Sequence, residues 1–163
     1  MGTMYRLDPV GESALEKVLD QGFALPEKPG SQPSLPEDLG ELDDPSLMEE
    51  FSLFTAWSDY AGAQVGLAVI SERSAELDLE WQISRYYSDA SRSAPVTITK
   101  AEALQDPDVY EARRKYEEAH AYRRLVADLA VRYERDAAVL SRELTRRTSE
   151  VSARSARRAR SVT

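Results

Sequence analysis

The chain has no cysteine, and among its 163 residues it has a single histidine, His120. The absence of thiols excludes a disulfide framework and a thiolate metal site, and one imidazole leaves little scope for acid–base or metal-ligand chemistry. Glycines are sparse and form no phosphate-binding loop, and no serine lies in a nucleophile-elbow pattern. We therefore expect a protein without enzymatic activity and without a bound cofactor or metal.

Long apolar runs are absent too. The N-terminal residues contain no apolar stretch of signal-peptide length, and no segment provides the roughly 20 apolar residues that a transmembrane helix needs. These absences predict a soluble, cytoplasmic protein that does not bind membranes.

Charged residues are abundant, and they are distributed unevenly. The formal net charge is −8; residues 1–50 contain twelve acidic and three basic side chains, whereas residues 142–163 contain seven basic and two acidic ones. Such an asymmetry is typical of interaction tails. We expect an acidic N-terminal segment, a central body of lower charge density and a basic C-terminal tail.

Residues 1–43 are predicted to form an acidic, proline-rich segment rather than a packed domain. A short helix is expected over residues 12–21, which carry an apolar stripe and precede the helix-stopping Gly22. Residues 23–44 place four prolines among glycine, serine and acidic residues. This composition buries too little apolar surface to offset the entropy lost on ordering, so we expect a disordered or extended segment.

The first long helix is expected over about residues 45–88. Asp44 can cap the free amides at its start, and Pro45 suits the first helical position. Two stripes of apolar or small residues run along it at spacings of three and four. The first stripe comprises Leu53, Ala56, Tyr60, Ala63, Leu67, Ile70, Ser74, Leu77 and Trp81. The second comprises Phe51, Phe54, Trp57, Ala61, Val65 and Ala68.

The second long helix is expected over about residues 107–147, because Asp106-Pro107-Asp108 repeats the same capping signature. Its stripe steps by three and four without a break, like a sustained heptad, and is widened in the middle by Tyr122, Leu125 and Leu129. The stripe comprises Val109, Ala112, Tyr116, Ala119, Arg123, Val126, Ala130, Tyr133, Ala137, Leu140 and Leu144. Residues 148–163, rich in Ser, Ala and Arg, are predicted to form a frayed or disordered basic tail.

These patterns predict an all-α fold, a long antiparallel helical hairpin with coiled-coil-like packing and a bend over residues 89–106. Each helix carries an apolar face wider than the one seam that a hairpin buries. The surplus apolar surface predicts a homo-oligomer.

Glu117 and His120 have the Glu-x-x-His spacing that di-iron helical bundles use. Those sites need a second motif of this kind, and the chain has no second histidine. We therefore expect His120 to be a surface or interface residue and not a metal ligand.

Aromatic and basic residues gather around the predicted bend and the start of the second helix. They are Arg85, Tyr86, Tyr87, Arg92, Lys100, Arg113, Arg114 and Lys115. Tyrosine rings stack on unpaired bases and cations neutralise phosphates, which is the pattern of sequence-tolerant single-strand binding. In the alternative interpretation the tyrosines close the hairpin core and the cations are ordinary solvated charge. The C-terminal arginines also have more than one interpretation. They could bind phosphates, make the chain more soluble, or pair with the acidic segment of a neighbouring chain.

Two short motifs resemble the phage recombination mediators of the UvsY type. Arg85-Tyr86-Tyr87-Ser88 is similar to the Arg-x-x-Tyr-Tyr-Ser-Gly ending of that family's first long helix, and Asp106-x-Asp108-Val109 is similar to its Asp-x-Asp-Val before the second. Trp57, early in the first helix, fits as well. The resemblance covers about residues 51–147, with Asp89 in place of the family's glycine and an added acidic extension.

The resemblance implies an oligomeric, non-enzymatic protein that binds single-stranded DNA and helps to load a recombinase. The implied partners are DNA and a recombinase or single-strand-binding protein, in the host cytoplasm if the chain is phage-encoded. The alternative hypothesis is a structural or assembly protein, such as a virion component or scaffold, whose helices form a coiled-coil multimer with no nucleic-acid role. A secreted hairpin of the Trp-x-Gly class is disfavoured, because no Trp-x-Gly occurs at the bend.

Overall fold

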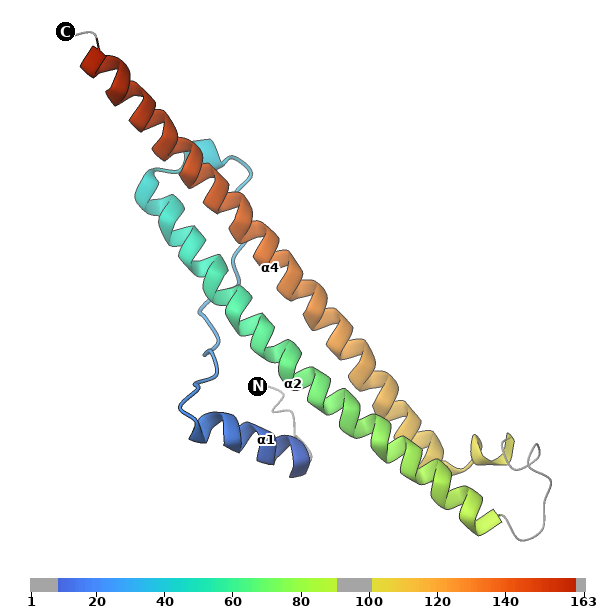
Figure 1. The fold of residues 1–163 in the computed structure, drawn as a ribbon. Helices are drawn as coiled ribbons and strands as arrows, with labels where there is room; N and C mark the ends of the chain where they lie inside the picture. The colour runs from blue at the N-terminus through green and yellow to red at the C-terminus, as the bar shows by residue number, and fades with distance from the viewer. Residues whose placement is uncertain (1–8, 91–100, 161–163) are drawn as a thin grey trace. The chain divides into compact units, whose positions relative to one another are not determined.

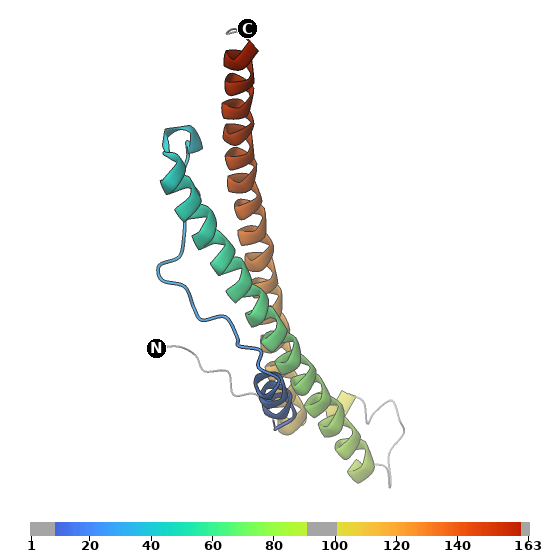
Figure 2. The same cartoon turned by 60° about the vertical axis from the view of Figure 1, so that its left-hand side comes forward.

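The fold is an all-α helical hairpin. The computed structural model describes residues 9–90 and 101–160, and within these ranges there is no β-strand. The elements are α1 (Pro9–Asp20), the short 3₁₀ helix η1 (Leu39–Glu41), α2 (Asp44–Ala90) and α4 (Pro107–Arg160) (Figure 1). The long helices α2 and α4 run side by side and antiparallel in both views (Figures 1 and 2), which confirms the predicted hairpin.

Both long helices begin at an aspartate cap followed closely by proline. At α4, Asp106 Oδ1 accepts hydrogen bonds from the backbone amides of Asp108 and Val109, at 2.9 and 3.3 Å, as the sequence predicts. At α2 the cap is Asp43 and not Asp44, because Asp43 Oδ1 accepts the amide of Ser46 at 2.8 Å. Hydrogen bonds from Ser46 accordingly lower the pKa of Asp43 below its usual range. Each carboxylate satisfies amides that the helix leaves free.

The short helix α1 ends where the sequence predicts it to end. Gly22 has a positive φ of 83°, and around it Phe23 N donates to Val18 O and Gly22 N donates to Leu19 O. This pair of bonds is the Schellman arrangement that a glycine in the left-handed conformation permits.

The described residues form two compact units. One consists of residues 26–62 and 128–163, and the other of residues 1–25 and 63–127. We call them the clamp unit and the tip unit, after the polar clamp and the hairpin tip described below. Each contains a part of α2 and a part of α4.

The core of the clamp unit is rich in aromatic side chains. Phe54 and Trp57 of α2 lie against Tyr133 of α4, with ring centroids 6.4 and 5.5 Å apart respectively. Small and aliphatic residues complete the buried cluster: Leu47, Ala61, Ala137 and Leu140. Burial of this apolar surface is the main driving force for pairing the two helices here.

The proline-rich segment before α2 is extended, but it is packed against the clamp unit. Leu35, Leu39 and Leu42 lie against the buried cluster. Trp57 Nε1 donates to the carbonyl of Ser31 at 3.1 Å, and Gln32 Nε2 donates to Tyr133 Oη at 2.6 Å. Residues 31–42 are extended around η1, as predicted, and none of them is fully buried. Their three leucines nevertheless make apolar contacts with the core that were not predicted from the sequence.

The seam of α2 is formed mainly by the second predicted stripe, with Leu53 and Tyr60 of the first stripe partly buried against the same core. Phe54, Trp57 and Ala68 of the second stripe are buried, whereas Leu77 and Trp81, at the end of the first, are about half exposed. A strict repeat of 3.5 residues drifts by about 20° per heptad around a straight helix. The first stripe therefore rotates out of the interface as it runs along α2.

The seam of α4 agrees with prediction in both units, including Val109, Ala112, Val126 and Leu140. The three residues predicted to widen it differ from one another: Tyr122 is half-buried, but Leu125 and Leu129 are exposed. The helix also continues to Arg160, past the predicted end at Arg147. Alanine and arginine are good helix formers, and ion pairs of Glu150 with Arg146 and Arg154 support the added turns.

A polar cluster explains why Arg123 interrupts the apolar stripe of α4. Glu72 of α2 accepts a hydrogen bond from Arg123 Nε and lies 2.6 Å from His120 Nδ1. Burial opposes ionisation of Glu72, but the bonds from His120 and Arg123 outweigh it and lower the pKa of this carboxyl below its usual value. His120 is thus an interface residue, as predicted, and it ties α4 to α2.

The lowered pKa of Glu72 predicts acid sensitivity of the tip unit. A carboxyl whose pKa is lowered by folding stabilises the protein above its unfolded pKa, about 4.3 for glutamate, and loses that contribution as the pH falls through the folded pKa. Glu72→Gln should therefore lower the melting temperature at pH 7 but flatten its decline below pH 4.3. Glu80→Gln, at an exposed position of the same helix, should change neither. Parallel melting curves of wild type and Glu72→Gln over the acid range would contradict this.

Candidate functional site

The predicted nucleic-acid-binding residues that the structure describes lie in the tip unit, where α2 ends and α4 begins. Arg85, Tyr86 and Tyr87 belong to the last turns of α2, and Arg113, Arg114 and Lys115 belong to the second and third turns of α4. We call this region, residues 81–90 and 101–118, the hairpin tip. Two further predicted residues, Arg92 and Lys100, lie outside the described residues.

Arg85 lies between an aromatic ring and a carboxylate. Its guanidinium carbon is 5.6 Å from the ring centre of Trp81, one turn earlier on α2, and its Nη1 is 4.0 Å from Asp108 Oδ2 of α4. The cation–π contact orients the guanidinium and leaves it accessible. Arg85 therefore links the two helices weakly and can exchange its carboxylate partner for another anion.

Tyr86 and Tyr87 are half-buried, and their rings meet edge to face at 6.4 Å. Burial, followed by the charges of Glu102 and Asp106, raises the pKa of Tyr86 above its usual value, so its hydroxyl stays protonated. An open, polar hollow of about 350 Å³ adjoins it. The hollow is lined by Gln82, Arg85, Tyr86, Asp89, Asp106 and Asp108.

The cations on α4 are paired with neighbouring carboxylates. Arg113 Nε lies 2.9 Å from Glu117, and Arg114 bonds Glu111 at 2.7 Å with Glu118 at 3.5 Å on its other side. The bond to Glu111 raises the pKa of Arg114. Lys115 is exposed. Each exposed pair is weak, so a phosphate can compete for these side chains.

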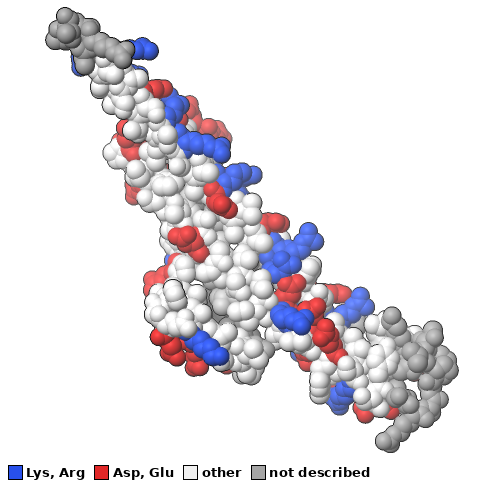
Figure 3. All heavy atoms as spheres, in the orientation of Figure 1, with Lys and Arg blue, Asp and Glu red and all other residues white. Residues whose placement is uncertain are grey.

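Acidic side chains outnumber basic ones at the hairpin tip, with seven carboxylates against four cations among residues 81–90 and 101–118. Figure 3 shows basic and acidic side chains interspersed on the visible face. The structure thus places Arg85 at the end of α2 and Arg113, Arg114 and Lys115 near the start of α4, with a carboxylate beside each arginine. Any binding of nucleic acid here relies more on stacking than on net charge.

Sequence reasoning missed the two most accessible aromatic rings of this region. Trp81 is 57% exposed and Tyr110 is 63% exposed, whereas Tyr86 and Tyr87 are half-buried. Trp81 was predicted as the last residue of the first apolar stripe of the first long helix, and Tyr110 was not among the predicted binding residues. The signal for Tyr110 was its place next to Val109, the first residue of the α4 seam, which turns Tyr110 away from the interface.

The described residues contain no group of three or more His, Asp or Glu side chains placed to hold a metal ion. None of the helices in the same ranges is long and apolar enough to span a membrane. No family model matches the chain, and neither the curated proteins nor the solved structures include a match.

Proposed function

We propose that this protein is a non-enzymatic mediator of DNA recombination that binds single-stranded DNA at the hairpin tip and helps to load a recombinase, as an oligomer. The observation that carries the proposal is the pair formed by Trp81 and Arg85, an exposed ring with a guanidinium held against it at 5.6 Å. Rings of this kind stack on unpaired bases of any sequence, and arginine adds phosphate and π contacts. The resemblance of the Arg85–Ser88 and Asp106–Val109 motifs supports the recombinase as partner.

The expected binding mode follows from the charges of the tip. Bases stack on Trp81 and Tyr110, while Arg85 leaves Asp108 for a phosphate. The surplus of carboxylates keeps the affinity modest. Because each phosphate contact on a single strand contributes about 0.7 to the slope of log affinity against log salt concentration, the few cations at the tip predict a shallow slope.

We expect Trp81→Ala with Tyr110→Ala to weaken binding of a fluorescent oligothymidylate by about tenfold or more at low salt, since stacking contributes about 1–3 kcal/mol per base. Asp108→Asn should strengthen binding, because it releases Arg85. Val131→Ala, at an exposed position of α4 in the clamp unit, is the control and should leave the affinity unchanged. Fluorescence anisotropy of the full-length proteins measures all four affinities, and absence of low-salt binding by the wild type would refute the proposal.

A second candidate function, a structural or assembly protein with coiled-coil contacts and no nucleic-acid role, is favoured by a different observation. Apolar side chains of both long helices remain exposed in the tip unit, among them Val69, Leu77 and Leu125. Contiguous exposed apolar surface marks sites of association. A concentration-dependent mass in light scattering, combined with no oligonucleotide binding, would select this function over the first.

A further inference from the structure

The C-terminal part of α4 continues past the other described elements of the clamp unit. Arg147 contacts Asp44, the first residue of α2, and every described side chain after it, from 148 to 158, is exposed. Figures 1 and 2 both show α4 running on alone beyond the start of α2. Residues 148–160, which we call the extension, span roughly 20 Å at about 1.5 Å per residue.

The extension continues the seam face of α4, but most side chains on this face are basic there and no longer apolar. The spacing of three and four that places Leu140, Leu144 and Arg147 against the rest of the clamp unit places Val151, Arg154 and Arg158 on the same face of the helix. Val151 is 60% exposed, and the Arg154 side chain is 81% exposed. An open hollow runs along this face and is lined by Val151, Arg154, Ser155, Arg157 and Arg158. On this face of α4, leucine gives way to arginine at the level where α2 begins.

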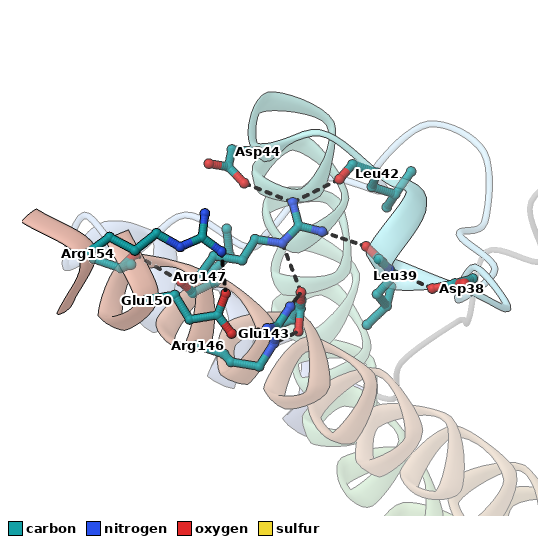
Figure 4. A network of polar contacts seen from close by, with 12 residues as sticks. Asp38, Leu39, Leu42, Asp44, Glu143, Arg146, Arg147, Glu150 and Arg154 are labelled. Carbon is teal, nitrogen blue, oxygen red and sulfur yellow. Dashed lines mark hydrogen bonds and ion pairs between the residues drawn. The ribbon is translucent and has the colours of Figure 1, made fainter. Parts of the chain in front are cut away.

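Arg147 is the last residue of this face that contacts another part of the clamp unit, and its contacts show what kind of partner an arginine at such a position binds. It donates to the carbonyls of Leu39 and Leu42 and to the carboxylates of Asp44 and Glu143, at 2.7 to 2.8 Å (Figure 4). We call this set of bonds the clamp. Three of these four acceptors belong to the acidic turn around η1. At Arg147 the seam of α4 therefore binds an acidic polypeptide turn, just as Arg123, earlier on the same seam, binds the carboxylate of Glu72.

The acidic region around η1 and the start of α2 also has an exposed surface, within residues 41–49. Glu41, Pro45, Met48 and Glu49 are all exposed, and the last three share one face of α2 by their spacing of three and four. Met48 beside Glu49 offers an apolar contact next to a carboxylate. This combination matches Val151 next to Arg154, whereas a phosphate backbone offers no apolar contact to Val151.

We propose that the extension of one protomer docks against residues 37–50 of a second copy of this chain. Both surfaces lie at the same end of the clamp unit, so a two-fold arrangement lets each protomer give one extension and receive the other. The charges agree, because residues 37–50 contain seven carboxylates and no cation, and the extension contains four arginines and one glutamate. The inference rests on the oligomer that the proposed function includes and adds which surfaces of the chain meet in it; DNA takes no part in this contact.

Charge reversal on each surface tests the docking. Arg154→Glu with Arg158→Glu, and separately Glu41→Arg with Glu49→Arg, should each weaken self-association by about tenfold or more, because like charges then face each other. An equimolar mixture of the two double variants should associate again, as a heterodimer. Sedimentation velocity at low and high salt measures the masses, and circular dichroism at 222 nm checks that the variants fold, which we expect because all four side chains lie outside the core.

Arg142→Glu is the matched control, an exposed arginine of α4 away from the seam face, and it should leave self-association unchanged. A monomeric wild type at every salt concentration would overturn the proposal, and so would a mixture of the variants that fails to associate. A monomer whose extension binds an oligonucleotide, with loss of binding in the Arg154→Glu Arg158→Glu variant, would overturn it in favour of a nucleic-acid tail.

Discussion

Leu140→Ala is expected to lower the free energy of unfolding by about 2–5 kcal/mol, the range for truncating a fully buried leucine. Leu140 is 0% exposed and belongs to the cluster that joins α4 to α2 in the clamp unit. The loss has two sources, the transfer free energy of the deleted carbon atoms and the cavity left in the cluster that also contains Phe54 and Leu47. Urea denaturation monitored by circular dichroism measures it.

Leu125→Ala is the matched control, with the same substitution on the same helix. Leu125 is 64% exposed, so the free energy of unfolding should change by less than about 0.5 kcal/mol. If both variants lost stability equally, the assignment of the α4 seam would be wrong. Should Leu125→Ala instead reduce the oligomeric mass, its exposed face would be a contact between protomers.

Arg147→Ala is expected to release the acidic turn from α4. The substitution removes the donor of the clamp and leaves the carbonyls of Leu39 and Leu42 without it, and unpaired acceptors next to a packed segment are costly. Amide hydrogen exchange of residues 38–46 should rise, and the melting temperature should fall more than in Arg142→Ala. Arg147→Lys should rescue little, because an ammonium cannot reproduce the planar fork of donors. Unchanged exchange at the turn would contradict the clamp.

The clamp also makes the stability of the protein depend on pH in the acid range. Hydrogen bonds from Arg146 and then Arg147 lower the pKa of Glu143 to about 2. Its contribution to stability is therefore present above the unfolded pKa of about 4.3 and is lost as the pH falls from there towards 2. In Arg147→Ala one of the two donors is gone, so the pKa of Glu143 should rise and the loss should begin at a higher pH.

The hairpin could be predicted from the sequence because the residues that determine each helix lie close together in the chain. The aspartate–proline caps and the three-and-four spacing of Val109, Val126 and Leu140 determine where the helices begin and which face of α4 is covered. Which face of α2 packs against α4 was harder to predict. The helix carries two apolar stripes, and only the packing against α4 determines which of them is buried. Arg123 and Arg147 interrupt the apolar pattern for reasons that lie 51 and 103 residues away, at Glu72 and Asp44. No local pattern contains such pairings.

The sequence indicated residues of the candidate site, but it did not show which of their side chains face solvent or pair with one another. The sequence places Arg85, Tyr86 and Tyr87 near the bend, and the structure agrees. Which rings face solvent depends on the rotation of α2, and the drift of the first stripe turned Trp81 outward. The carboxylates that pair with Arg113 and Arg114 were visible in the sequence as neighbours at spacings of three and four, yet only the structure shows them bonded.

The clamp has a consequence for how the chain folds during synthesis. Arg147 bonds to carbonyls 105 and 108 residues earlier in the chain, so the turn around η1 has no partner until nearly all of α4 has been made. At a synthesis rate of roughly 5–20 residues per second, residues 31–44 wait for about 5–20 s. During that time Leu35, Leu39 and Leu42 lack the α4 part of the cluster against which they pack. We expect the negative charge of the first fifty residues to limit contacts between nascent chains while this part of the clamp unit is incomplete.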